Sequence, residues 1–262
     1  MHKKTFLTPL FFALILGVSS ASVSASDAQG KKNSHWSYAG EDGPNAWGQL
    51  NQEYITCQTG KRQSPINLDA SRDRRGRKGG LPTLRFRYNA SPLSVDNNGH
   101  TLQFNYAQGS HLEAMGKTYQ LKQFHLHAPS EHSIHGRPYD MEAHFVHQDE
   151  AGNLAVVGVM FLTGPRNGLL EKLLPLAPTK VHQQTTTPVP FNGAFLLPRY
   201  HDYYHYDGSL TTPPCSEGVS WFVLKYPAYA SREQIAFFKS IIQDNARPRQ
   251  ALNGRNISES EY

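Results

Sequence analysis

The chain has 262 residues, of which 26 are Lys or Arg, 21 are Asp or Glu and 13 are His, so its formal net charge is +5 when the histidines are neutral. This positive charge is too mild and too evenly spread to indicate a nucleic-acid-binding protein. Beyond the first 25 residues no stretch is apolar enough to span a bilayer.

The N-terminal segment has the pattern of a secretory signal peptide. The basic residues His2-Lys3-Lys4 precede a largely apolar run over residues 6–18, and Val23-Ser24-Ala25 fits a small-residue cleavage site. The alternative, an N-terminal core helix, is disfavoured by Pro9 inside the run. We therefore predict that residues 1–25 are removed and that the protein is exported, either to a periplasm or to the exterior.

Residues 26–262, about 237 in number, are predicted to form one domain. The loss of Lys3 and Lys4 leaves 24 basic residues against 21 acidic ones, a net charge near +3. Cys57 and Cys215 are the only cysteines, and in an oxidising compartment we predict that they form a disulfide. A buried free thiol at each position is the alternative.

The first part of this domain shows clustered aromatic residues followed by strand patterns. Aromatic residues lie among turn residues over 35–47, where they are predicted to pack as a plug over one end of the core. Residues 62–68 are typical of an extended entry to an edge strand. Alternating apolar residues predict strands at 84–88 and 102–106, and Asn97-Asn98-Gly99-His100 predicts a turn between them.

Histidines recur at alternate positions in two neighbouring runs, Gln-x-His-x-His at 123–127 and Glu-x-His-x-Val-His at 142–147. Alternate side chains of a strand share one face. If the two runs are paired strands, His125, His127 and His144 meet on one face. Three imidazole nitrogens that leave a fourth position for water form a zinc site of the catalytic type.

The neighbours of these histidines support a metal site. Gln123 and Glu142 each lie two residues before a ligand, where they can orient its other ring nitrogen. One alternative is that some of the 13 histidines fall at even spacing by chance. The other is a cupin motif, His-x-His-x3-Glu, in which Glu131 is itself a ligand. The second cupin motif, Pro-x-Gly-x2-His, has no match, because residues 137–143 contain no Gly.

The rest of the chain predicts one buried strand and two helices. Residues 154–162 are almost wholly apolar, which is typical of a strand buried on both faces. Residues 169–174 predict a short helix that ends at Pro175. Ser231-x-x-Gln234 is a capping box that predicts the start of a second helix.

Several of these motifs resemble those of one known family. The runs at 123–127 and 142–147, with Ser-Glu-His at 130–132 between them, are similar to the metal site of an α-class carbonic anhydrase of the bacterial, exported type. Ser-Leu-Thr-Thr-Pro-Pro at 209–214 is similar to the most specific loop of that family. The resemblance extends from about residue 35 to residue 255.

Strand patterns and the resemblance together predict a single, mostly β domain around a large, mainly antiparallel, twisted central sheet with a few short helices. The resemblance implies reversible hydration of carbon dioxide to bicarbonate and a proton. In that reaction a zinc-bound hydroxide attacks carbon dioxide, and a histidine carries the proton to solvent. It implies Zn²⁺ as the cofactor, held by His125, His127 and His144, and a small molecule as the partner.

The resemblance also assigns roles to other residues. The catalytic residues it implies are His100, as the proton shuttle, and Glu131 and Thr211, which orient the hydroxide. The substrate wall it implies consists of Val146, Val156, Leu210, Thr212 and Trp221. The supporting residues it implies are Gln123, Glu142, Asn245, Tyr38, Asn98 and Gln103. The short connection at 148–153 predicts a more open cavity mouth than in many members of the family.

Two other functions remain as hypotheses, a metal-binding or scaffold protein without turnover and a zinc-dependent ester hydrolase. The presence of all three ligand histidines, Glu131 and Thr211 disfavours the scaffold. A weak esterase side activity and a homodimer are further hypotheses. Asn89 and Asn256 begin Asn-x-Ser sequons, which matter only in a host that glycosylates exported proteins.

Overall fold

The structure, a computed structural model, describes residues 35–69, 80–187 and 189–260. The predicted signal peptide at 1–25 lies outside these residues. Within the described ranges, no helix combines the length and apolar character that crossing a bilayer requires.

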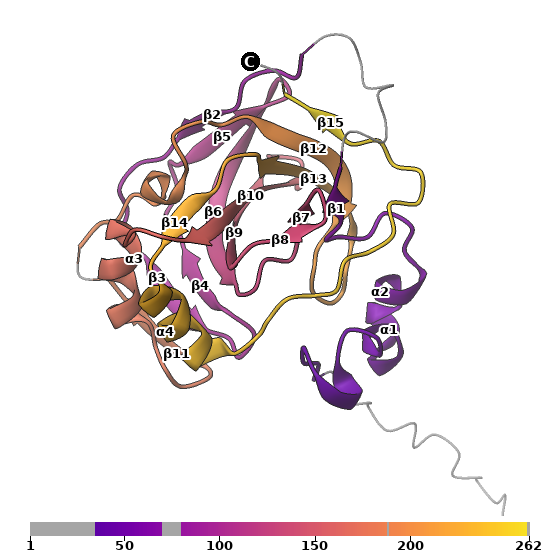
Figure 1. The fold of residues 1–262 in the computed structure, drawn as a ribbon, viewed down its shortest axis with the longest axis horizontal. Coiled ribbons are helices and arrows are strands. Elements are labelled where there is room, and N and C mark those ends of the chain that lie inside the picture. The colour runs from indigo at the N-terminus through magenta and orange to yellow at the C-terminus, as the bar shows by residue number, and fades with distance from the viewer. Residues whose placement is uncertain (1–34, 70–79, 188, 261–262) are drawn as a thin grey trace, which may run out of the picture. The chain divides into compact units, whose positions relative to one another are not determined.

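A sheet of twelve strands dominates the described part of the chain (Figure 1). Its strands are β2 (Arg85–Arg87), β3 (Ser94–Asn97), β4 (Leu102–Asn105), β5 (His111–Ala114), β6 (Lys117–His127), β9 (Met141–Gln148), β10 (Leu154–Thr163), β11 (Gln183–Thr186), β12 (Tyr203–Ser209), β13 (Glu217–Leu224), β14 (Ala228–Ala230) and β15 (Ser258–Glu259). The main path runs β11-β3-β4-β6-β9-β10-β13-β12-β15. Strand β5 pairs with β2 and β6, and β14 pairs with β10. Most pairs are antiparallel, and β10 pairs in parallel with β13 and β14. The predicted fold class is therefore confirmed.

Smaller elements complete the described fold. A second sheet joins β1 (Asn67–Leu68), β7 (Ser133–Ile134) and β8 (Arg137–Pro138). The α-helices are α1 (Trp47–Leu50), α2 (Thr56–Thr59), α3 (Gly168–Leu173) and α4 (Arg232–Ile242), and the 3₁₀ helices are η1 (Gly40–Asp42), η2 (Gln52–Tyr54), η4 (Leu174–Leu176) and η5 (Gly193–Leu196). The predicted capping box at Ser231 and Gln234 is present at the start of α4.

The alternation of side chains on β6 and β9 separates a core face from a polar face. Phe124 pairs with Phe145 in the register of these strands, and both are fully buried in the main hydrophobic core. His125 pairs with His144 on the other face. Burial of each phenylalanine contributes about 1.5–3 kcal/mol, so the core fixes the register of the two strands. A shift by one residue would move the histidines into the core.

The predicted turn at residues 97–100 joins β3 to β4. Gly99 has φ +85°, a conformation that favours glycine. The side-chain oxygen of Asn98 accepts hydrogen bonds from the backbone N–H groups of His100 and Thr101 at 2.9 and 2.8 Å. This Asx-type turn fixes the backbone at His100.

The predicted strands are present, with some differences. The strand expected at 84–88 shortens to β2, because Leu84 and Tyr88 continue into the core without ladder pairing. The strand expected at 154–162 is β10, and it is almost wholly buried. Strands β3 and β5 are among those that the sequence did not predict, since each has only four residues.

Candidate metal centre and active site

Two neighbouring strands bring three imidazoles together. His125 and His127 project from β6 and His144 projects from β9. One ring nitrogen from each residue lies within 4.8 Å of the other two. The ring centroids are 4.5–5.3 Å apart. The cluster that the spacing of the histidines predicted is therefore formed.

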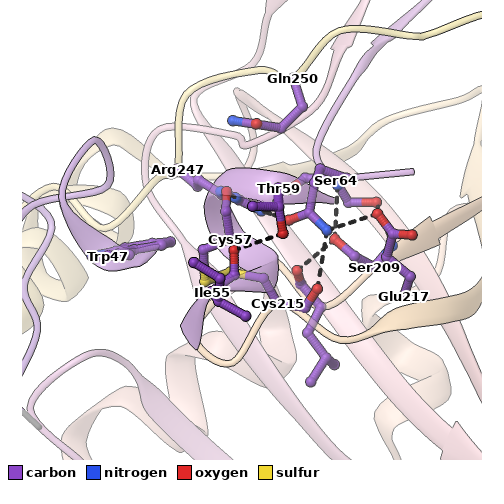
Figure 2. The surroundings of a disulfide bond; sticks show 12 residues. Trp47, Ile55, Cys57, Thr59, Ser64, Ser209, Cys215, Glu217, Arg247 and Gln250 are labelled. Carbon is purple, nitrogen blue, oxygen red and sulfur yellow. Dashed lines mark hydrogen bonds between the residues drawn. A yellow bond between two sulfur atoms is a disulfide. The ribbon is translucent and has the colours of Figure 1, made fainter. Parts of the chain in front are cut away.

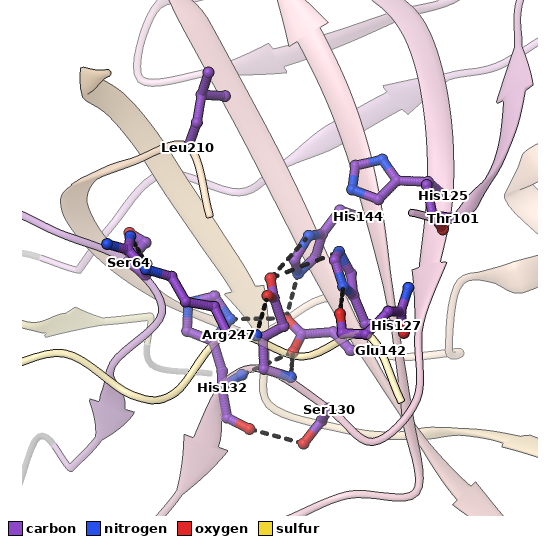
Figure 3. A network of polar contacts seen from close by, with 12 residues as sticks. Ser64, Thr101, His125, His127, Ser130, His132, Glu142, His144, Leu210 and Arg247 are labelled. Atoms are coloured by element: carbon purple, nitrogen blue, oxygen red, sulfur yellow. Dashed lines mark hydrogen bonds and ion pairs between the residues drawn. The ribbon is translucent and has the colours of Figure 1, made fainter. Parts of the chain in front are cut away.

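The outward nitrogen of each imidazole meets an acceptor. His125 Nδ1 lies 2.8 Å from Gln123 Oε1, and His127 Nδ1 lies 2.7 Å from the backbone oxygen of Asn245. His144 Nε2 lies 2.9 Å from Glu142 Oε1 (Figure 3). Because each acceptor requires a proton on the nitrogen that faces it, the inward nitrogens keep a lone pair.

These lone pairs define which atoms would hold a metal. They belong to Nε2 of His125, Nε2 of His127 and Nδ1 of His144. His127 Nε2 is buried and has no hydrogen-bond partner among the described residues. A buried acceptor without a partner costs about 1–3 kcal/mol, which a bound cation removes. Three converging imidazole nitrogens with oriented outer nitrogens fit zinc with an open fourth position.

The electrostatics favour the neutral form of His125 and His127, but not that of His144. Burial lowers the pKa of His125 well below its usual value and also lowers the pKa of His127. Burial acts in the same direction on His144, but the Glu142 carboxylate raises the pKa of His144 overall. Burial acts to raise the pKa of Glu142, yet His132 and His144 hold it well below its usual range. Glu142 is therefore an ionised acceptor behind the metal site.

The histidine cluster lies at the base of a cavity of about 160 Å³. Besides the three histidines, the lining residues are Trp36, Tyr38, Asn98, His100, Thr101, Gln103, Gln123, Val146, Val156, Leu210, Thr211, Thr212 and Trp221. The cavity thus brings together every residue that the sequence assigned to the substrate wall. Val146, Val156, Leu210 and Trp221 give it an apolar side suited to a small uncharged molecule.

The chain is similar to known proteins in both sequence and structure. Residues 42–261 match the family model for eukaryotic-type carbonic anhydrase. A carbonic anhydrase of Neisseria gonorrhoeae is 43% identical over 232 residues, which cover 87% of this chain and 88% of that protein. A carbonic anhydrase of Pectobacterium carotovorum is 41% identical over 249 residues, 95% of this chain and 98% of that protein. The solved α-carbonic anhydrase of Thermovibrio ammonificans, in complex with sulfanilamide, is 44% identical with a TM-score of 0.82, and the match covers 86% of this chain and 98% of that one.

The chain belongs to the eukaryotic-type, or α, carbonic anhydrase family. It is thereby a member of a family of enzymes that are generally zinc-dependent, and it carries a histidine cluster that could bind the metal. Membership excludes the cupin alternative. The resemblance drawn from the motifs at 123–147 and 209–214 is confirmed.

In this carbonic anhydrase fold, His100 stacks against an aromatic ring at the cavity wall. The rings of His100 and Trp36 are parallel within 9° and their centroids are 3.7 Å apart. Burial lowers the pKa of the half-buried His100, and His35 and His182 lower it further. The sequence placed Trp36 only in a structural plug, because nothing in the local pattern indicates which ring it would contact.

The geometry of Glu131 differs from the expectation. Glu131 Oε1 accepts a hydrogen bond from the backbone N–H of Arg247 at 2.9 Å. Its Oε2 lies 3.6 Å from His127 Nε2 and 3.8 Å from His144 Nδ1, and it has no hydrogen-bond partner among the described residues. The orienting role that the resemblance implies for Glu131 and Thr211 requires a hydrogen bond between them, and the Thr211 hydroxyl does not donate one to Oε2 here. The carboxylate instead turns its second oxygen towards the imidazole cluster.

The predicted disulfide is present between Cys57 on α2 and Cys215 after the threonine-rich loop. Figure 2 shows Arg247 beside this bond. Arg247 donates from Nη2 to the backbone oxygen of Cys57 at 3.0 Å and from Nη1 to that of Ser64 at 2.8 Å. The backbone N–H of Arg247 also donates a hydrogen bond to Glu131. This arginine therefore connects the disulfide to the metal site.

A second buried chain of polar groups extends from Glu142, and the sequence did not predict it. His132 Nδ1 lies 2.8 Å from Glu142 Oε1 (Figure 3). His132 Nε2 lies 2.7 Å from the Tyr206 hydroxyl. The Tyr206 hydroxyl in turn lies 2.8 Å from the Ser64 hydroxyl. In the sequence, only the Ser-Glu-His motif at 130–132 indicated a role for His132. Its partners lie 10 and 74 residues away in the sequence.

Proposed function

We propose that this protein catalyses the reversible hydration of carbon dioxide to bicarbonate and a proton, with Zn²⁺ as its cofactor. One observation carries the proposal. Three imidazoles present converging lone pairs, and His127 Nε2 is buried there without a hydrogen-bond partner among the described residues. When bound by His125, His127 and His144, zinc supplies a hydroxide nucleophile near neutral pH by lowering the pKa of water, an effect for which carbonic anhydrases are the standard example.

Thr211 and Glu131 would orient the reacting groups. A threonine hydroxyl has one hydrogen and two lone pairs. The Thr211 hydroxyl can therefore accept a hydrogen bond from the nucleophile only if its own hydrogen points away from it. Glu131 Oε2 has no hydrogen-bond partner among the residues that the structure describes, so it is an acceptor within the site. We propose that the Thr211 hydroxyl turns towards it in the loaded enzyme. This arrangement would direct a lone pair of the nucleophile's oxygen at the carbon dioxide.

The cavity walls would separate the substrate from the route of the proton. The apolar side formed by Val146, Val156, Leu210 and Trp221 accepts carbon dioxide, with Thr212 beside it. Asn98, Gln103 and Tyr38 are polar residues of the same lining. Burial raises the pKa of Tyr38 well above its usual range, so its neutral hydroxyl can order water.

His100 would move the proton from the cavity to solvent. Its ring lines the cavity, and a half-buried imidazole with a lowered pKa releases a proton readily to buffer.

Weak ester hydrolysis would use the same nucleophile. We also propose that the protein is exported, which is consistent with the disulfide, and that it forms a homodimer.

The experiment that tests the function measures zinc content and carbon dioxide hydration on one purified sample. The proposal predicts about one zinc per chain and activity that is lost on chelation and restored by zinc. Protein with a full complement of zinc and no hydration activity would instead support the scaffold hypothesis. Ester hydrolysis without carbon dioxide hydration would support the hydrolase hypothesis.

A further inference from the structure

Exposed aromatic side chains gather around one groove that shares no lining residue with the metal site. This groove of about 510 Å³ lies beside β14 and is lined by segments at 165–168, 195–200 and 226–229. Phe195 is 72% exposed, and Tyr200, Tyr226 and Tyr229 are each 42–48% exposed. Apart from Phe237, every large aromatic residue found exposed within the described ranges lines it. We call this feature the aromatic groove.

Contiguous exposed aromatic area is a sign of a binding surface, since single exposed rings are normal but a cluster is not. The rings of Tyr200 and Tyr226 lie 5.5 Å apart with an interplanar angle of 54°. Pro165, Pro198 and Pro227 also line the groove. Proline restricts the backbone, so the groove is held open with little entropy left to lose on binding.

The aromatic groove is cationic. Arg199 and Arg166 line it, and none of its described lining residues is acidic. Arg166 pairs with Glu171 at 3.2 Å. The Arg199 guanidinium lies 5.5 Å from the centroid of the Tyr200 ring, and no carboxylate of the described residues forms an ion pair with it. Arg199 is therefore available to a ligand with a carboxylate.

The neighbouring edge of strand β14 is poorly suited to binding an extended peptide. The backbone oxygen of Tyr229 on β14 accepts a hydrogen bond from Asn167 Nδ2 at 3.3 Å. The backbone oxygen of Ala230 accepts one from the Gly164 N–H at 2.9 Å. Recognition by strand addition needs free backbone groups on the edge strand, and these two acceptors are occupied.

We propose that the aromatic groove binds an acidic oligosaccharide of the polyuronate class. The C–H face of a pyranose ring stacks on tyrosine and phenylalanine rings, and sugar hydroxyls match the phenol groups at the rim. A uronate carboxylate pairs with the fork of Arg199. A second copy of the chain fits less well, because a groove-to-groove contact would place two cationic surfaces together. A bilayer fits less well because the surface is hollow rather than protruding.

The test is calorimetric titration of the purified full-length protein with tetragalacturonate and with a mannuronate oligomer, at low and at high salt. Maltotetraose serves as the uncharged sugar. The variants are Tyr226→Ala and Arg199→Gln, and the matched controls are Phe237→Ala and Arg137→Gln, which remove an exposed ring and an exposed arginine elsewhere. Carbon dioxide hydration of each variant reports that the fold is intact.

The proposal predicts saturable binding of at least one polyuronate, weakened by salt and reduced about tenfold in both groove variants and in neither control. Maltotetraose should bind more weakly than the polyuronate. Failure of both polyuronates to bind, or binding that survives both groove substitutions, overturns the proposal. Binding to anionic phosphatidylglycerol vesicles, or self-association, that is lost in the groove variants would overturn it in favour of a membrane or a second copy.

Discussion

Acidification from pH 7 to pH 5 should destabilise the fold by about 2 kcal/mol through one buried imidazole, that of His147. His147 is fully buried on the core face of β9. Its Nδ1 lies 3.2 Å from the backbone oxygen of Ala155, and its Nε2 lies 2.6 Å from the Tyr88 hydroxyl. Nδ1 therefore carries the proton, and Nε2 accepts a hydrogen bond from Tyr88. A second proton on Nε2 would displace that hydrogen bond inside an apolar core.

The magnitude follows from the difference in pKa between the folded and unfolded states. Burial lowers the pKa of His147 from its ordinary 6.5 to about 4. The neutral form is therefore favoured by folding, and its stabilisation is complete above the unfolded pKa. As the pH falls from 6.5 towards 4, the unfolded chain takes up a proton that the folded chain does not. The loss is about 2 kcal/mol at pH 5 and about 3 kcal/mol at pH 4, since one pKa unit corresponds to 1.36 kcal/mol.

Urea unfolding of the metal-free protein at pH 7, 6 and 5 measures this effect, with His147→Gln as the variant that cannot titrate. Other titrating groups contribute equally to both proteins, so they cancel in the difference. The stability advantage of the wild type over His147→Gln should shrink by about 2 kcal/mol between pH 7 and pH 5. His182→Asn, an exposed histidine at a positive φ that Asn tolerates, is the control. A constant advantage across this pH range would refute the reasoning.

Three further predictions concern the site and its support. Replacement of His100 by Ala should lower kcat at low buffer concentration and leave kcat/KM nearly unchanged, and added imidazole should restore part of kcat. Glu131→Ala should keep zinc and lose rate, because the carboxylate acts through Thr211; loss of zinc in this variant would identify Glu131 as a ligand. Reduction of the Cys57–Cys215 bond should lower the free energy of unfolding by up to about 5 kcal/mol, because the bridge closes a loop of 158 residues. Mass spectrometry of the exported protein should find no free thiol.

Control variants distinguish these outcomes from a general loss of folding or stability. His135→Asn is the match for His100→Ala, because it removes an exposed histidine at a positive φ that does not line the cavity. An unchanged kcat for His100→Ala in weak buffer would remove His100 as the principal shuttle and make His35 the next candidate. For the disulfide, a double Cys→Ser variant of the same stability as the wild type would contradict the entropic argument.

Short-range patterns predicted the centre of the site. The period of two placed His125, His127 and His144 on one face, and their neighbours Gln123 and Glu142 behind two of them, because strand geometry depends only on local spacing. The register is confirmed by the pairing of His125 with His144. The capping box that begins α4 was predictable for the same reason.

Contacts between distant segments were not predictable in the same way. The stacking of Trp36 on His100 joins residues 64 positions apart in the sequence, and its geometry depends on where two loops meet. Arg247 reaches Cys57 and Ser64 across 190 and 183 positions. The resemblance implied a role for Asn245, two residues before Arg247, but nothing in the sequence indicates that Arg247 links the disulfide to Glu131. The direction of Glu131 Oε2 likewise depends on the packing around it.

The most direct test of the central claim compares zinc content and carbon dioxide hydration for the wild type, His127→Ala and the matched control His147→Gln in one preparation. His127 Nε2 is buried and has no hydrogen-bond partner in the described part of the chain, whereas His147 lies on the opposite face of the sheet. The account predicts about one zinc per chain and full activity in the wild type and in His147→Gln, and the joint loss of zinc and activity in His127→Ala. Stoichiometric zinc and undiminished hydration in His127→Ala would contradict it.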